Sequence, residues 1–148
     1  MPPTEPVATS DTFGTAHHVA LLVLRIASAL VFLYHGSAIL FGAFGGPGPE
    51  RFAAFIHAPA AAGYLVGLAQ FCGDLAMLTG AFMRIGAISI MIVMLGAIFM
   101  VHLQHGFDVT KGGVEYALTQ LLLAFALSLT GSGKYSLSSV LPKPLRTL

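Results

Sequence analysis

The stretch HHVALLVLRIASALVFLYHGSAILFG, residues 17–42, decides the fold class of this chain. It is apolar almost throughout and carries a single full charge, Arg25. A helix needs about 20 such residues to cross the hydrocarbon core of a bilayer. An open sheet cannot cross it, because its edge N–H and C=O groups would find no partner in lipid, and the alternation typical of a strand is absent. Residues 17–42 therefore predict a membrane-spanning helix.

Three further stretches have the same character: residues 60–82, 84–106 and 114–130, of which the last is the shortest. The links between the four stretches are short, which favours antiparallel neighbours. The sequence therefore predicts an all-α membrane protein whose residues 17–137 form an antiparallel bundle of four transmembrane helices.

The two ends of the chain differ from this domain. Residues 1–16 are rich in Pro and Thr and lack Lys and Arg, so they predict a disordered tail rather than a signal peptide. Residues 138–148 contain two prolines and predict a C-terminal tail.

The composition excludes several classes of protein. Of 148 residues, 56% are hydrophobic and 9% are charged, and the mean hydropathy is +0.85. A soluble domain carries about a quarter charged residues, so a soluble globular enzyme and a disordered chain are both excluded. Seven Lys and Arg against six Asp and Glu leave no basic surface for nucleic acid. The single cysteine, Cys72, excludes an internal disulfide and a CxxC redox pair.

Positive charge predicts the orientation, because cytoplasmic loops of membrane proteins carry the excess of Lys and Arg. The side of the bundle that holds both termini has four such residues: Arg84, Lys134, Lys143 and Arg146. The opposite side has two: Arg51 and Lys111. We therefore expect both termini to lie in the cytoplasm.

The first loop on the outer side is unusual. Gly and Pro fill residues 45–49 and predict a tight turn. After it, Phe52, Phe55 and Ile56 fall at helical spacing before Pro59. This pattern predicts a short interfacial helix, which either caps the outer mouth of the bundle or only anchors the chain where it re-enters the membrane.

Ionisable residues inside spanning helices are costly and are candidates for function. Arg25, Ser28 and His35 share one face of the first helix, and Gln70 and Asp74 share one face of the second. By helical rise, Arg25 and Asp74 both lie about 12 Å from the cytoplasmic end of their helices. We therefore expect an ion pair between them, with Gln70 one turn farther out. The pair either fixes the register of the helices or forms a proton or anion site.

A second polar layer is expected near the outer face. It brings together side chains from three helices: His35, His102, His105, Glu115, Tyr116 and Gln120. Two histidines and a carboxylate could ligate a metal, and two facing histidines could hold a haem. Histidine, tyrosine and glutamine could equally bind the carbonyl oxygens of a quinone in an apolar slot. The remaining alternative is a polar layer whose members only satisfy one another.

With these residues the chain resembles the DoxX family of small four-helix membrane proteins over almost all of residues 20–137. The resemblance is carried by LRIASALVFLYHGSAILFGAFGGPG at 24–48, Gly73-Asp74, Arg84, His102 with His105-Gly106-Phe107, GGVEY at 112–116 and GSGKYSL at 131–137. The family usually has a glutamate where this chain has Asp74, which keeps the charge but shortens its reach. Arg25, His35, His102 and Glu115 match the family pattern.

The resemblance implies a multi-pass protein of the bacterial cytoplasmic membrane with a link to redox metabolism. Some relatives are described as membrane subunits of a thiosulfate:quinone oxidoreductase. Others are associated with oxidative-stress or thiol-stress complexes, and others with resistance to quinones and catechols. The resulting hypothesis is a quinone-binding membrane subunit, in which the outer layer holds the quinone and a partner oxidoreductase supplies the electrons. The alternatives are a non-enzymatic membrane anchor or assembly factor, and a small-solute transporter, which would need a homo-oligomer.

Overall fold

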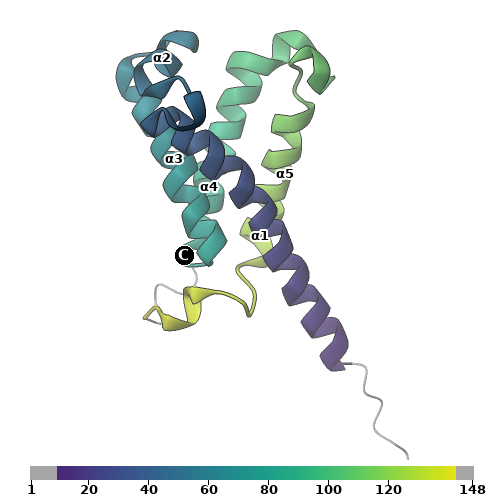
Figure 1. The fold of residues 1–148 in the computed structure, drawn as a ribbon. Coiled ribbons are helices and arrows are strands. Elements are labelled where there is room, and N and C mark those ends of the chain that lie inside the picture. The colour runs from purple at the N-terminus through teal and green to yellow at the C-terminus, as the bar shows by residue number, and fades with distance from the viewer. Residues whose placement is uncertain (1–9, 143–148) are drawn as a thin grey trace, which may run out of the picture.

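A computed structural model describes residues 10–142 of the chain. The described residues are largely helical and contain no strand. The four apolar helices are α1 (Ser10–Phe41), α3 (Ala60–Thr79), α4 (Met83–Ala97) and α5 (Glu115–Thr130). A short helix, α2 (Gly48–Phe55), connects α1 to α3 and lies at the top of Figure 1.

Short helical segments complete the chain. The π-helical segment η2 (Ile98–His102) and the 3-10 turn η3 (Leu103–His105) continue α4 without a break. Three further 3-10 turns lie in the loops: η1 (Ala43–Gly45), η4 (Val109–Lys111) and η5 (Leu137–Val140). The four predicted apolar stretches are thus all helical.

Within residues 10–142, three helices are long and apolar enough to cross a membrane: Gly14–Phe41, Ala60–Thr79 and Met83–His105. The chain is therefore an integral membrane protein. The fourth helix, α5, is apolar but has 16 residues, which rise about 24 Å and fall short of a 30 Å core. That α5 completes a four-span bundle stays a prediction.

The first helix begins earlier than the sequence pattern predicts. It starts at Ser10 rather than His17, so residues 10–16 of the expected disordered tail are helical. No proline lies between Ser10 and Phe41, and a helix can continue past the end of its apolar run when nothing breaks it. The rest of the expected tail, residues 1–9, lies outside the described residues, as do residues 143–148 of the C-terminal tail.

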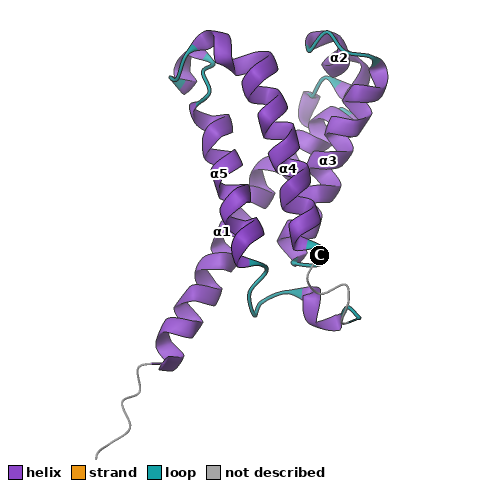
Figure 2. Ribbon diagram, turned by 180° about the vertical axis from the view of Figure 1, so that it is seen from behind, coloured by secondary structure: helices purple, strands orange, loops and turns teal. Residues whose placement is uncertain are grey.

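The helices pack in the order of the chain. α1 packs mainly against α3. α3 also packs against α4, and α4 packs against α5. The contact between α1 and α5 is smaller. Figures 1 and 2 show α1 crossing the other helices obliquely and extending beyond them at its N-terminal end.

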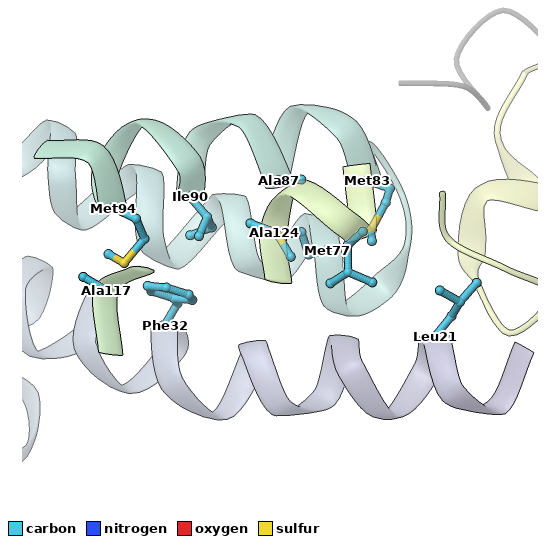
Figure 3. Packing of buried hydrophobic residues seen from close by; sticks show 10 residues of the cluster. Leu21, Phe32, Met77, Met83, Ala87, Ile90, Met94, Ala117 and Ala124 are labelled. Atoms are coloured by element: carbon cyan, nitrogen blue, oxygen red, sulfur yellow. The ribbon is translucent and has the colours of Figure 1, made fainter. Parts of the chain in front are cut away.

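Small residues allow the close contacts between these helices. A Cβ added to Gly36 of α1 would lie 2.7 Å from the backbone nitrogen of Phe71 in α3. Gly67 of α3 also permits a close approach, since a Cβ there would lie 3.1 Å from Cβ of Leu40. Figure 3 shows the apolar core between the helices, which includes Phe32, Met77, Ile90, Met94 and Ala124.

Candidate functional site

A cavity of about 440 Å³ lies between α1, α2, α3, the α4–η2 helix and α5. Pockets for small molecules commonly measure about 300–1,000 Å³. Much of the wall is apolar and includes Phe32, Ile39, Val66, Val93, Met94 and Ala97. Four polar side chains also line it: His35, Gln70, His102 and Tyr116. An apolar space with a few polar groups is the usual form of a site that binds an organic ligand.

The short helix α2 supplies one wall of the cavity. Phe52, Phe55 and Ile56, the residues expected at helical spacing, all line it. Pro49 stands in the first turn of α2, where a backbone N–H needs no helical partner. Gly63 of α3 lies directly against the backbone of Pro49, and a Cβ at that glycine would overlap it. The predicted helix is thus present and contributes to the cavity, while its place at a membrane surface stays a prediction.

The opposite wall comes from the π-helical segment η2. Met100, Val101 and His102 of this segment line the cavity. A π-helical turn contains an additional residue compared with an α-helical turn, so it redirects the side chains that follow. Such turns are frequent at functional sites. η2 therefore sets the direction in which His102 projects from the end of α4.

His102 is held in one tautomer. Its Nδ1 lies 2.7 Å from the carbonyl oxygen of Gly112. A carbonyl oxygen only accepts hydrogen bonds, so Nδ1 carries the hydrogen and donates it. In the neutral ring Nε2 then has a lone pair and is an acceptor. The side chain lines the cavity and has no other hydrogen bond among the described residues, so this acceptor is available to a ligand.

Gln70 and His35 also have hydrogen-bonding capacity that the described protein does not use. The Gln70 side chain is 5% exposed, and its Oε1 is buried without a partner within the described chain. A buried amide oxygen without a donor costs about 1–3 kcal/mol. His35 makes an edge-on contact with the ring of Tyr34 at 5.4 Å between ring centres and has no hydrogen bond to any described residue. Both residues can therefore accept new partners from a ligand.

The cavity unites only part of the predicted outer layer. His35, His102 and Tyr116 line it, whereas Glu115 and Gln120 are not among its lining residues. Glu115 instead accepts a hydrogen bond from the backbone nitrogen of Val109 at 3.1 Å and so holds the loop before α5.

Two other members of that layer also face elsewhere. Gln120 has a buried Oε1 with no partner among the residues that the structure describes, but it lies outside the cavity wall. His105 is exposed, and its Nδ1 lies 3.0 Å from the carbonyl oxygen of Val101. Gln70, which was expected one turn from the Arg25–Asp74 pair, lines the cavity instead.

The expected ion pair between Arg25 and Asp74 is not formed. Arg25 is 1% exposed and donates only to backbone carbonyls. Its Nε donates to Met77 at 2.7 Å, Nη2 donates to Leu78, and Nη1 donates to Ser132 at 2.8 Å and Tyr135 at 2.7 Å. Carbonyl oxygens in the last turn of a helix lack their i+4 helical N–H, and the guanidinium with its five donors supplies hydrogen bonds here, in addition to the one that Met77 accepts from the backbone N–H of Gly80 at 3.1 Å.

Asp74 uses a different partner. It is fully buried, and its Oδ1 accepts a hydrogen bond from the hydroxyl of Ser28 at 2.7 Å. Its Oδ2 has no hydrogen bond within the described chain. Ser28 was expected on the same face as Arg25, and it occupies the position next to the carboxylate instead of the arginine. Burial of both charges was predicted correctly, but their direct pairing was wrong.

The described residues contain no group of three or more His, Cys, Asp or Glu side chains placed to hold a metal ion. The histidines of the cavity come from different helices, and each has a separate environment. What the arrangement offers is an apolar space, neutral donors and acceptors, and two imidazoles that can exchange protons with a ligand.

A model of the DoxX family matches residues 20–103, which is more than half of the chain and covers α1 from Ala20 onward, α2, α3, α4 and η2. No curated protein and no solved structure matches the chain.

Proposed function

The chain belongs to the DoxX family, and we propose that it is a redox-linked membrane subunit that binds a quinone in the cavity between α1, α2, α3, η2 and α5. The observation that supports this proposal is the cavity, whose apolar wall carries four polar side chains. A quinone needs such a site, because its ring and tail are apolar and its oxygens require a small number of placed polar groups. The cavity volume of about 440 Å³ fits one ring with the start of its tail.

Each polar side chain has a role in this proposal. The amide N–H of Gln70 and the hydroxyl of Tyr116 donate hydrogen bonds to ligand oxygens. His35 and His102 exchange protons with the bound ring, since an imidazole nitrogen can either donate or accept a hydrogen. When bound, the quinone supplies the redox chemistry, and a partner oxidoreductase exchanges the electrons. The chain has one cysteine and therefore no dithiol of its own for that exchange.

The proposal also includes a location. We place the chain in the bacterial cytoplasmic membrane with both termini in the cytoplasm, so that α2 and the cavity lie toward the outer surface. Reporter domains fused to the C-terminus test this orientation. An alkaline phosphatase fusion should be inactive and a fluorescent-protein fusion bright, and the reverse pattern would contradict the orientation without affecting the cavity.

Direct binding tests the function. The purified chain in nanodiscs should bind duroquinone saturably, after subtraction of the amount that empty nanodiscs take up. The variant H35A should bind more weakly. H102N should bind the reduced ligand, duroquinol, more weakly, since asparagine can keep the donor to Gly112 while Nε2, which accepts from a ligand hydroxyl, is removed. The matched control is H105N, which changes an exposed histidine outside the cavity and should bind as the unsubstituted chain does.

Absence of saturable binding would overturn the proposal, and so would unchanged binding in both cavity variants. The anchor or transporter hypothesis would then replace it. A liposome uptake assay with the same protein distinguishes those two.

A further inference from the structure

We infer that the cavity selects the reduced, hydroxylated form of its ring ligand, a quinol, over the corresponding quinone; this inference rests on the proposed function. A quinol carries two hydroxyl groups, each of which donates a hydrogen bond. A quinone carries two carbonyl oxygens, which only accept. Selection between the two therefore depends on whether the free polar atoms of the cavity are acceptors or donors.

His102 contributes a free acceptor. Its Nδ1–H is committed to the carbonyl oxygen of Gly112 at 2.7 Å. The edge of the ring that remains for the cavity contains Nε2, which in the neutral tautomer holds a lone pair. A ligand hydroxyl can donate to this atom. A ligand carbonyl would place its own lone pairs against it, and two acceptors repel one another.

Gln70 contributes a second acceptor. Its Oε1 is buried and has no donor among the described residues, and the side chain is 5% exposed and lines the cavity. The amide N–H groups of Gln70 can donate to either form of the ligand and so do not discriminate. The unpaired oxygen does discriminate, because only a hydroxyl or an N–H can remove the cost of leaving it without a partner.

The remaining polar groups do not reverse this preference. The hydroxyl of Tyr116 can donate to a carbonyl or accept from a hydroxyl, and His35 can do either according to its tautomer. The two discriminating acceptors come from separate elements, α3 and η2, which line the same cavity. A quinol has two hydroxyls, so each of the two acceptors can receive one hydrogen bond from it.

The test compares two ligands of the same size. Duroquinol and duroquinone differ only in their oxidation state, and each is titrated under argon onto the chain in nanodiscs, with empty nanodiscs as the partition control. A net hydrogen bond changes affinity about two- to tenfold, so two bonds that only the quinol makes predict a preference for duroquinol of about tenfold or more. Tetramethylphenol, with one hydroxyl, should fall between duroquinol and the hydrocarbon durene.

Two variants test whether Gln70 and His102 cause the preference for the quinol. Q70L and H102N each remove one acceptor and should reduce the preference to about threefold. The matched controls Q120L and H105N alter a half-buried glutamine and an exposed histidine outside the cavity and should retain the full preference. The comparison of the two ligands on the unsubstituted chain decides the question even where a variant fails to fold.

Equal affinity for the two ligands, or tighter binding of duroquinone, would overturn the inference and leave the proposed function standing. Loss of the preference in Q120L or H105N would overturn the assignment to Gln70 and His102. If neither ligand binds saturably, both the inference and the proposed function are wrong.

Discussion

Arg25 joins three parts of the chain, and its replacement by methionine should destabilise the structure strongly. R25M keeps an apolar side chain of similar length but removes every donor. Carbonyl oxygens of Met77, Leu78, Ser132 and Tyr135 then lose the hydrogen bonds that Arg25 donates. Each bond contributes about 1 kcal/mol net, so the four together predict a loss of about 4 kcal/mol. Whole domains are stable by about 5–15 kcal/mol, so this loss is large.

The free energy of unfolding can be measured by titrating SDS into mixed micelles and following the helical circular dichroism. R25K keeps the charge but has only three donors on one nitrogen, so its loss should lie between zero and that of R25M. The control is R51M, which removes an exposed arginine from α2 and should change stability by less than about 0.5 kcal/mol. A loss below about 1 kcal/mol in R25M would refute the role given to these hydrogen bonds.

Three further predictions follow from other polar residues. S28A removes the one hydrogen-bond donor to the buried carboxylate of Asp74 among the described residues and should cost about 1–3 kcal/mol in the same SDS titration, whereas no change would contradict that contact. Q120L replaces a buried amide whose oxygen has no partner in the described chain and should be neutral or stabilising by up to about 1 kcal/mol; a large loss would indicate a partner for this side chain. The side-chain hydroxyl and the backbone N–H of Thr110 donate to Asp108 and hold the pKa of this exposed carboxyl below its ordinary value. Its contribution to loop stability is therefore present above the ordinary pKa and lost as pH falls through the folded-state value. The hydrogen-exchange protection of the Thr110 amide should fall with it, and D108N should show no such pH dependence.

The helices follow from the sequence because their limits have local causes. Pro59 precedes the first residue of α3, and Gly131 follows the last residue of α5, and both ends were predicted at the observed residues. The start of α1 was missed, because residues 10–16 contain neither an apolar pattern nor a residue that stops a helix. Periodicity reports the apolar face of a helix and does not report how far the helix continues in polar sequence.

The sequence predicted only those site residues whose position follows from the direction of their helices. His35, His102 and Tyr116 were expected near the same end of antiparallel helices, and the cavity brings them together. The position of Gln70 in that cavity was missed. Counting residues along a helix gives the depth of a side chain in the membrane, but it does not show whether a cavity lies beside that side chain. The π-helical turn that redirects His102 has no signal in the sequence.

Arg25 and Asp74 show a second limit of prediction from the sequence. The rise per residue placed Arg25 and Asp74 at the same depth and so suggested an ion pair. The pairing that forms instead uses backbone carbonyls at the end of α3 as acceptors for the arginine, and Ser28 as the donor to the carboxylate. The last turn of any helix has carbonyl oxygens without an i+4 partner, whatever side chains it carries. The residue types therefore do not predict that such carbonyls will compete with Asp74 for the arginine.

Photolabelling with an azido-quinone tests most directly whether the cavity is the quinone site. Irradiation of the chain in nanodiscs, followed by mass spectrometry, should place the label on peptides that contain residues 52–56 of α2 or residues 93–102 of α4 and η2. An excess of duroquinol should suppress this labelling. Labelling spread over the lipid-facing residues of the helices, or labelling that excess duroquinol leaves unchanged, would contradict binding in the cavity.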